Sequence, residues 1–236
     1  MSYFLKENQK KIDNRIRIPY KNKKTGRSVF ICILKMKKDK AAKRISQIIE
    51  ATFSCIAKEG YGNVTMNSIA KYSKLSKGAI NHYFKKKEDI LIAVLNELDR
   101  KIFQLVDEKV RNSVNYEDHI KYRITEPFEN ITNDPTLFYV LVDFMSMSNT
   151  NANYKERVKY FLKKYRYLSS VGVRSGLEAG AYRNIDPEII GTIMVSIYLG
   201  FGIQWILDKE NINFKELTKT WLDMLIKYLE DKTRTI

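Results

Sequence analysis

Apolar residues recur at helical spacing along most of this 236-residue chain. Between residues 40 and 58, apolar residues and one threonine stand at positions 45, 48, 49, 52, 53, 56 and 57. This is the pattern of an amphipathic helix with one buried stripe. The later segments are also helical in pattern, and only residues 29–34 resemble a strand. The sequence therefore predicts an all-α fold.

Capping residues and prolines divide this pattern into separate helices. Thr65 and Ser76 are the expected N-cap residues of two short helices. Pro127 predicts a kink or a break in a later helix, because proline lacks the backbone N–H that a helix interior needs. The expected helices cover residues 40–58, 66–73, 77–84, 88–111, 117–130, 135–147, 153–178, 187–207 and 213–229.

Positive charge is concentrated at the amino end. The whole chain carries a net charge of +15, of which residues 1–44 contribute +12 and residues 45–87 a further +5. The remainder is therefore close to neutral. This asymmetry predicts a polyanionic partner for the amino-terminal part, either nucleic acid or an anionic membrane surface. Charge alone does not distinguish the two.

The composition argues against several classes of protein. Two cysteines and two histidines are too few for a disulfide scaffold, and they make a structural metal site improbable. We therefore expect a reduced, intracellular protein that holds no metal ion or cofactor. The sequence also lacks a paired nucleophile and base and a phosphate-cradling glycine loop. The chain is not expected to be an enzyme.

Residues 1–35 show no helical period and contain clusters of lysine. Met36 opens the sequence MKKDKAAKRI, which resembles a fresh amino terminus. Two interpretations follow: residues 1–35 are a spurious upstream extension, or they are a real basic arm that is disordered. In either case we expect this extension to precede two domains, at residues 36–87 and 88–236.

Two short helices joined by a tight turn, with a longer helix before them, form a helix-turn-helix. Ile80 is expected to be buried, so that most of the helix over residues 77–84 faces outward. Gly78 and Ala79 are small enough to let the start of this helix approach base edges closely. Free backbone N–H groups at the starts of both short helices can bind anions. This arrangement indicates binding to double-stranded DNA.

The stretch TMNSIAKYSKLSKGAINHYFKKKEDIL, within residues 40–95, resembles the DNA-binding domain of the TetR family of bacterial repressors. Asn81 departs from the family pattern, which usually has an aromatic residue there, and Lys74 departs from its usual turn glycine. The resemblance implies an amino-terminal three-helix DNA-binding domain followed by a helical ligand-binding and dimerisation domain. The residues that match are Leu75, Ser76, Lys77, Gly78, Ile80, Tyr83, Phe84, Lys87, Glu88 and Leu91.

The same resemblance implies roles for individual residues. Thr65, Lys77, Tyr83 and Lys87 would contact phosphates, and an asparagine at position 81 can pair with adenine. Asn81 and His82 also fit a simpler interpretation, as solvated polar residues. The full set expected at the DNA is Thr65, Ser76, Lys77, Gly78, Ala79, Asn81, His82, Tyr83 and Lys87.

Residues 189–207 carry no charge and are long enough to cross a membrane. Small and polar residues within this segment, such as Ser196 and Gly200, favour instead a buried bundle or an interface between two copies. A membrane-associated helical protein with residues 189–207 inserted is the alternative. The segment from Gly176 to Asp208 is also similar to the carboxyl-terminal domain of the choline-responsive betaine-pathway repressor group.

Aromatic residues in the helices that follow the helix-turn-helix indicate a ligand pocket. A carboxylate among aromatic rings, as at Asp143, suits a cationic or hydrogen-bonding ligand. The same aromatic residues are also typical of a protein core, and Asp143 can instead pair with an arginine or face water. The candidate pocket residues are Phe128, Tyr139, Asp143, Phe144, Tyr165 and Trp205.

These observations lead to one expectation. The protein is a cytoplasmic, ligand-responsive transcriptional regulator, a repressor that binds a palindromic operator as a homodimer and is released by a small-molecule effector. It requires no membrane partner.

Overall fold

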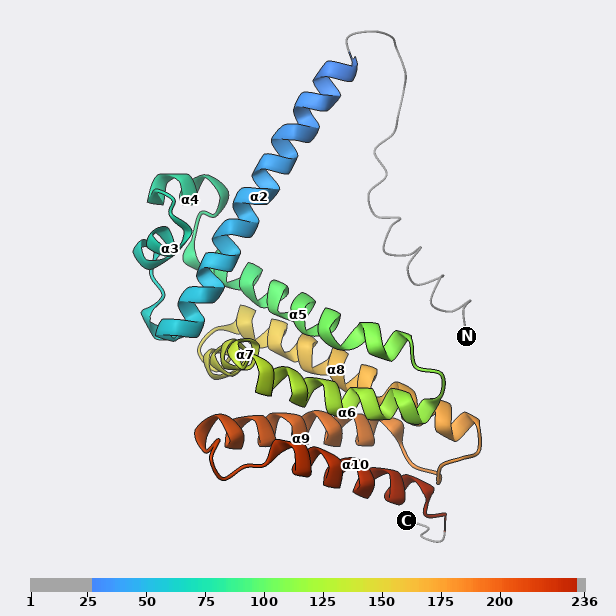
Figure 1. Cartoon of the computed structure of the whole chain (residues 1–236). Coiled ribbons are helices and arrows are strands. Elements are labelled where there is room, and N and C mark those ends of the chain that lie inside the picture. The colour runs from blue at the N-terminus through green and yellow to red at the C-terminus, as the bar shows by residue number, and fades with distance from the viewer. Residues whose placement is uncertain (1–26, 233–236) are drawn as a thin grey trace. The chain divides into compact units, whose positions relative to one another are not determined.

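A computed structural model describes the backbone of residues 27–232 and the side chains of residues 39–106 and 109–232 (Figure 1). The expected extension at residues 1–35 thus lies outside the described residues as far as residue 26. Residues 45–236 form one compact unit, and the residues up to 44 belong to another. The described part of the chain contains helices and no strand, which confirms the all-α prediction.

The helices follow one another through short connections (Figure 1). They are α2 (Arg27–Glu59), the 3₁₀ turn η1 (Tyr61–Asn63), α3 (Met66–Ser73), α4 (Lys77–Tyr83), α5 (Lys87–Arg111), α6 (Tyr116–Asn133), α7 (Thr136–Met147), α8 (Ala152–Glu178), α9 (Pro187–Leu207) and α10 (Phe214–Glu230).

Helix α2 begins earlier than the sequence pattern predicts. Residues 29–34, which resemble a strand in the sequence, are part of this helix. A short apolar run fits either kind of element, because its periodicity alone cannot separate a strand from a stretch of helix. The strand interpretation was therefore wrong.

Side-chain caps fix several helix starts where the sequence predicts them. Thr65 Oγ1 accepts the backbone N–H of Ser68, and Ser68 Oγ accepts the N–H of Thr65, which makes a capping box at the start of α3. Ser76 caps α4 through its hydroxyl oxygen. Helix α7 starts one residue later than expected, at Thr136, whose N–H is accepted by Asp134.

Helix α6 continues through Pro127 without the break that the proline allows. The side chains on both sides of the proline, Ile124 and Phe128, are buried. A proline inside a helix costs about 3 kcal/mol, and burying each of these two side chains returns about 1.5–3 kcal/mol. Packing of the apolar stripe therefore outweighs the local preference to end the helix.

Two clusters of buried side chains hold residues 45–236 together. The first joins α2, α3 and α4 to α5, α7 and α8 and includes Ile69, Ile80 and Phe144. The second joins α6, α9 and α10 and includes Phe128 and Leu225. Because α8 also packs on α6 and α9, the helix-turn-helix and the carboxyl-terminal helices share a continuous packed interior.

Candidate nucleic-acid interface and internal cavity

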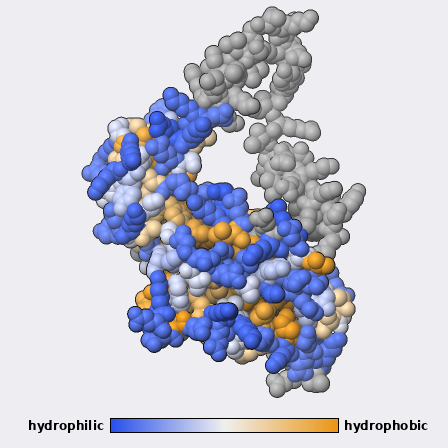
Figure 2. Space-filling view, viewed as in Figure 1, coloured by the Kyte–Doolittle hydropathy of each residue, from blue (hydrophilic) through white to orange (hydrophobic). Residues whose placement is uncertain are grey.

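Helix α4 is anchored by one side and presents the other outward. Ile80 is completely buried, whereas Lys77, Gly78, Asn81 and His82 are exposed. The surface over α3 and α4 is mostly hydrophilic (Figure 2). A helix held in this way can enter a groove of DNA without exposing the core that supports it.

The other residues predicted at the DNA, apart from Lys87, surround this face. Thr65 and Ser76 are exposed at the starts of α3 and α4, where their hydroxyl groups already serve as caps. Ala79 and Tyr83 are half-buried. The ring of Tyr83 meets His82 edge-on with centroids 4.9 Å apart, so each ring restricts the other.

Lys87 lies apart from this group and contacts the protein. Its Nζ donates to the carbonyl oxygen of Val64 at 3.1 Å and stands 5.9 Å from the ring centroid of Tyr61. These contacts tie the start of α5 to the turn that precedes α3. Lys85 and Lys86 are exposed beside α4, so they are cations near the interface that the sequence-based set omits. The run Lys85-Lys86-Lys87 in the sequence could have indicated these two additional cations.

The turn between α3 and α4 depends on an unusual backbone conformation. Lys74 has a φ of +54°, the only positive value at a described residue other than glycine. In this conformation the N–H of Leu75 donates to the carbonyl of Ala70 and closes the end of α3. A side chain is strained there and glycine is not, which explains why a glycine is usual at this position in the resembling family.

The turn η1 is fastened to α7. The backbone N–H of Tyr61 donates to Oδ2 of Asp143 at 3.1 Å. The Tyr61 ring also meets Phe144 and Tyr154 edge-on, with centroids 5.9 and 6.1 Å away. Asp143 and Phe144, which the sequence suggested for a pocket, thus connect the helix-turn-helix to the helices behind it.

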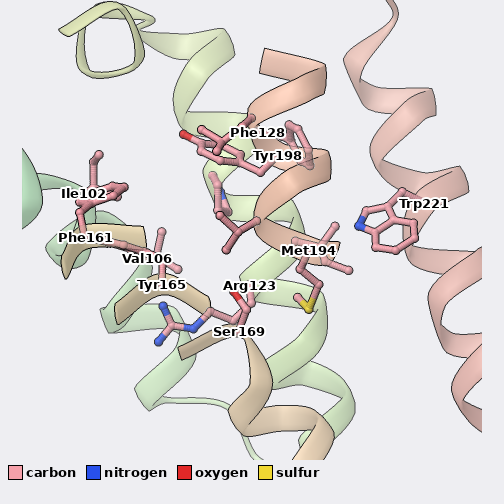
Figure 3. A pocket seen from close by; sticks show the side chains of 14 residues that line it. Ile102, Val106, Arg123, Phe128, Phe161, Tyr165, Ser169, Met194, Tyr198 and Trp221 are labelled. Atoms are coloured by element: carbon pink, nitrogen blue, oxygen red, sulfur yellow. The ribbon is translucent and has the colours of Figure 1, made fainter. Parts of the chain in front are cut away.

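A cavity of about 50 Å³ lies between α5, α6, α8, α9 and α10 (Figure 3). Of the predicted pocket residues, Phe128 and Tyr165 line it. Tyr139 and Trp205 do not, and Trp205 stacks on the ring of Phe214 instead. Most of the lining is apolar, and Arg123 is the one charged residue among the side chains described there.

A smaller cavity of about 20 Å³ adjoins the first. The two share lining from Ile102, Val106, Pro127 and Tyr198. The second is also bordered by Leu105, whose side chain is 44% exposed. The two cavities therefore form a path between the bundle interior and the surface.

Burial keeps the titratable groups around the cavity neutral. Desolvation raises the pKa of Tyr165, whose hydroxyl donates to the carbonyl of Asp99 at 3.2 Å. Desolvation also raises the pKa of Tyr198. One helical turn before Arg123, burial and then the charge of Arg123 lower the pKa of His119 to about 4. Among the side chains described at the cavity wall, the charge at neutral pH thus comes from Arg123.

The sequence marks Arg123 as unusual, but the residue pattern alone does not show what Arg123 contacts. Arg123 stands three residues after Ile120 and falls within the apolar stripe that continues at Ile124 and Phe128. A charged residue in such a stripe indicates a buried polar contact or a ligand contact. Tyr198, which also lines the cavity, gave no comparable signal because its neighbours in sequence are all uncharged.

One face of α9 is apolar and exposed, while the opposite face packs on α8. Helix α9 is also the one described helix that is long and apolar enough to cross a membrane. Apolar side chains reach the surface over the carboxyl-terminal helices in Figure 2. The exposed residues of α9 after its first turn are Thr192, Ile193, Ser196, Ile203, Gln204 and Leu207, with Ile189 exposed before them and Gly200 half-buried among them.

Comparison with known proteins gives consistent matches. Residues 48–94 match the family described as "Bacterial regulatory proteins, tetR family". The fatty acid metabolism regulator protein of Bacillus subtilis is 23% identical over 187 residues, which cover 79% of this chain and 95% of that protein.

Two solved structures share the fold. The regulator FadR from Bacillus subtilis, solved in complex with stearoyl-CoA, has a TM-score of 0.68 at 21% identity, covering 78% of this chain and 98% of its own. A regulator from Saccharomonospora viridis, solved in complex with choline, has a TM-score of 0.71 at 19% identity, covering 79% and 97%.

These likenesses agree with the residues that carry the helix-turn-helix. The matched proteins are transcriptional regulators rather than enzymes. Their fold, a helix-turn-helix domain followed by a helical domain, confirms the expected architecture. The resemblance drawn from the sequence is thereby confirmed: residues 48–94 match the TetR family of bacterial regulators, and the chain is similar in sequence and fold to regulators of that family.

Proposed function

We propose that the protein is a repressor that binds a palindromic operator as a homodimer and releases it when a small molecule binds. In this proposal residues 36–87 bind DNA, and residues 88–236 hold the effector and the partner subunit. The protein acts in the cytoplasm, where its operator is. The observation that carries the proposal is the continuity of α5, which starts directly after α4 and lines the internal cavity.

The exposed face of α4 would lie in the major groove. Asn81 would read a base edge, and Lys77 would contact a phosphate. The net charge of +5 on residues 45–87 supports this partner, because phosphate contacts dominate the affinity of such proteins for DNA. The residues proposed at the DNA remain Thr65, Ser76, Lys77, Gly78, Ala79, Asn81, His82, Tyr83 and Lys87.

The exposed face of α9 would form the dimer interface. Six of its exposed and half-buried residues recur alternately every four and every three positions, which is the spacing of a seam between two packed helices: Ile189, Ile193, Ser196, Gly200, Ile203 and Leu207. Two of them, Ser196 and Gly200, are small and allow close approach. A lipid-facing surface requires neither this spacing nor small residues, so the pattern favours a second copy over insertion into a membrane.

The size of the cavity supports regulation by an effector. A volume of about 50 Å³ is room for only a few water molecules at most, so a larger molecule must displace the helices that line it. Ile102 and Val106 of α5 are among the lining residues. Because Lys87 joins α5 to the turn before α3, movement of α5 would change the position of α4.

Footprinting on the DNA around the gene tests the proposal. We expect a protected inverted repeat, protection that weakens steeply as salt rises, and a lower affinity for all sequences in Lys77→Ala. Asn81→Ala should instead relax the preference at one base position. The absence of any protected repeat at low salt would contradict the proposal.

The oligomeric state is tested separately, by sedimentation of the purified protein. We expect a dimer, and we expect the variant Ile203→Glu to be monomeric, because it places a charge in the middle of the proposed seam. Recovery of the native protein in the membrane fraction would favour the alternative in which residues 189–207 are inserted.

A further inference from the structure

We propose that the effector is an amphipathic carboxylate, such as a long-chain fatty acid, whose head group binds Arg123 inside the bundle. Its alkyl chain would occupy the apolar path past Tyr198 toward Leu105. This inference rests on the proposed function, since it names the ligand class of the cavity through which that function is regulated.

The position of Arg123 favours a ligand with an anionic head group. Arg123 lies on α6 and is only 8% exposed, and Figure 3 shows it beside Tyr165 and Ser169 at one side of the cavity. A guanidinium presents five N–H donors in a planar fork, so it can donate to a carboxylate in addition to its contacts within the protein. A charge-assisted pair inside an apolar site is stronger than the same pair in water.

The space beyond Arg123 favours an apolar chain. Phe128 and Tyr198 lie on the other side of the cavity in Figure 3, and the adjoining cavity continues from Tyr198 to the half-exposed Leu105. This path runs from Arg123 in the first cavity to Leu105 in the second, and its lining is predominantly apolar. An extended alkyl chain fits such a path once the helices part, and its burial supplies the free energy for parting them.

The charges around the cavity disfavour a cationic ligand. A cation such as choline would lie beside the positive charge of Arg123. Among the described residues, no carboxylate lines the first cavity to pair with such a cation. Asp143, the carboxylate that the sequence suggested, accepts the N–H of Tyr61 elsewhere in the unit. Asp134 borders the second cavity, but it is exposed at the start of α7.

The same reasoning distinguishes a free acid from its coenzyme A thioester. The coenzyme group is too large for the interior and must remain outside, so the methyl end of the chain would be directed inward toward Arg123. Arg123 would gain no favourable contact from the methyl end of the chain and would lose solvation beside it. A free fatty acid can bind in the opposite orientation, with its carboxylate directed inward, so that the carboxylate and Arg123 bring opposite charges together.

Ligand binding to the full-length protein tests this assignment. Trp221 lines the cavity, so its fluorescence in a Trp205→Phe background reports on ligands that enter there. We expect palmitate to bind at least about tenfold more tightly than hexadecanol, which has the same chain without the charge. Choline and palmitoyl-CoA should bind more weakly than palmitate.

Variants at position 123 make the test specific. Arg123→Leu should lower the affinity for palmitate about tenfold or more while leaving that for hexadecanol unchanged or higher. Arg123→Lys should give an intermediate loss, because an ammonium lacks the fork, and it preserves the charge if the leucine variant fails to fold. Lys121→Gln is the matched control, an exposed cation two residues earlier on α6, and should change neither affinity.

Equal binding of palmitate and hexadecanol to the native protein would overturn the inference, and so would tighter binding of palmitoyl-CoA or choline. An affinity for palmitate that is unaffected in both position-123 variants would overturn it as well. DNA binding is measured on the same preparations. A protein that protects its operator but ignores palmitate loses only this inference, whereas one that binds no DNA refutes the proposed function itself.

Discussion

At the scale of single residues, Lys74 is the clearest case of local strain. Its left-handed conformation suits glycine, and a side chain there costs about 1 kcal/mol. We therefore expect Lys74→Gly to raise the free energy of unfolding by about 0.5–1 kcal/mol in urea titrations. The same substitution three residues earlier, Lys71→Gly, lies inside α3 and should lower it by about 1 kcal/mol. A loss of stability in both variants would contradict this account of the turn.

His119 makes stability depend on pH. Its pKa is about 4 in the folded protein and about 6.5 when exposed, so between these values the unfolded chain binds more protons. Stability should therefore fall as the pH drops from about 6.5 to about 4, by at most about 3 kcal/mol from this residue.

The two histidines of the chain allow a direct comparison for this effect. In thermal unfolding at several pH values, His119→Gln should flatten the dependence of stability between pH 4 and 6.5, and His82→Gln, at an exposed position, is the control for replacing a histidine. Identical pH profiles for the two variants would show that His119 is not buried in the neutral form.

Residues whose role depends on near neighbours were predictable from the sequence. The Thr65 and Ser76 caps act within three residues, and the burial of Ile80 follows from helical spacing. Asp143 was not predictable in the same way, because its partner Tyr61 lies 82 residues away. A tertiary contact of this kind leaves no pattern in a single sequence.

At the scale of helices, the contact between α8 and α9 depends on one glycine. A Cβ at Gly191 would lie 2.2 Å from the carbonyl oxygen of Arg166, so the helices approach too closely for a side chain there. We expect Gly191→Ala to lower the stability measured in denaturant titrations by about 1–3 kcal/mol or more.

Gly200 in the same helix provides the control for that variant. A Cβ at Gly200 would meet nothing within 4 Å in the single subunit, and alanine favours helix over glycine by about 1 kcal/mol. Measured in the Ile203→Glu background, in which no second copy is expected to pack on α9, Gly200→Ala should therefore retain or raise stability. Equal effects at the two positions would mean that the close approach of α8 and α9 is not what Gly191 provides.

Helix existence was predictable, but two boundaries were not. Local rules allowed a break at Pro127, and burial of Ile124 and Phe128 overrides that preference. The apolar run at residues 29–34 has no period long enough to identify it as part of α2. The cavity was predictable only in part, because a space enclosed by five helices depends on how they pack rather than on any one of them.

At the scale of the whole unit, two connections run from the cavity to the helix-turn-helix. One is α5. The other is α7, where Phe138 meets the cavity-lining Tyr198 edge-on at 5.6 Å and Asp143 accepts the N–H of Tyr61. A ligand that displaces Tyr198 would therefore move α7 as well, and Asp143 would transmit this movement to the DNA-binding helices.

Asp143→Ala removes this second connection and leaves α5 intact. We expect the variant to bind operator DNA and palmitate, but the factor by which palmitate weakens DNA binding should fall severalfold, because coupling then depends on α5 alone. Titrating DNA with the protein at zero and saturating palmitate measures this factor. Ser148→Ala is the control, since it removes a side-chain hydrogen bond to the carbonyl of Met145 at the end of the same helix, at a similar cost of about 1 kcal/mol, without touching Tyr61 or either cavity. If both variants reduce the factor equally, the loss reflects a weakened α7 rather than the link to Tyr61. If neither does, α5 carries the signal by itself, and the hydrogen bond from Tyr61 to Asp143 serves only to hold the two parts together.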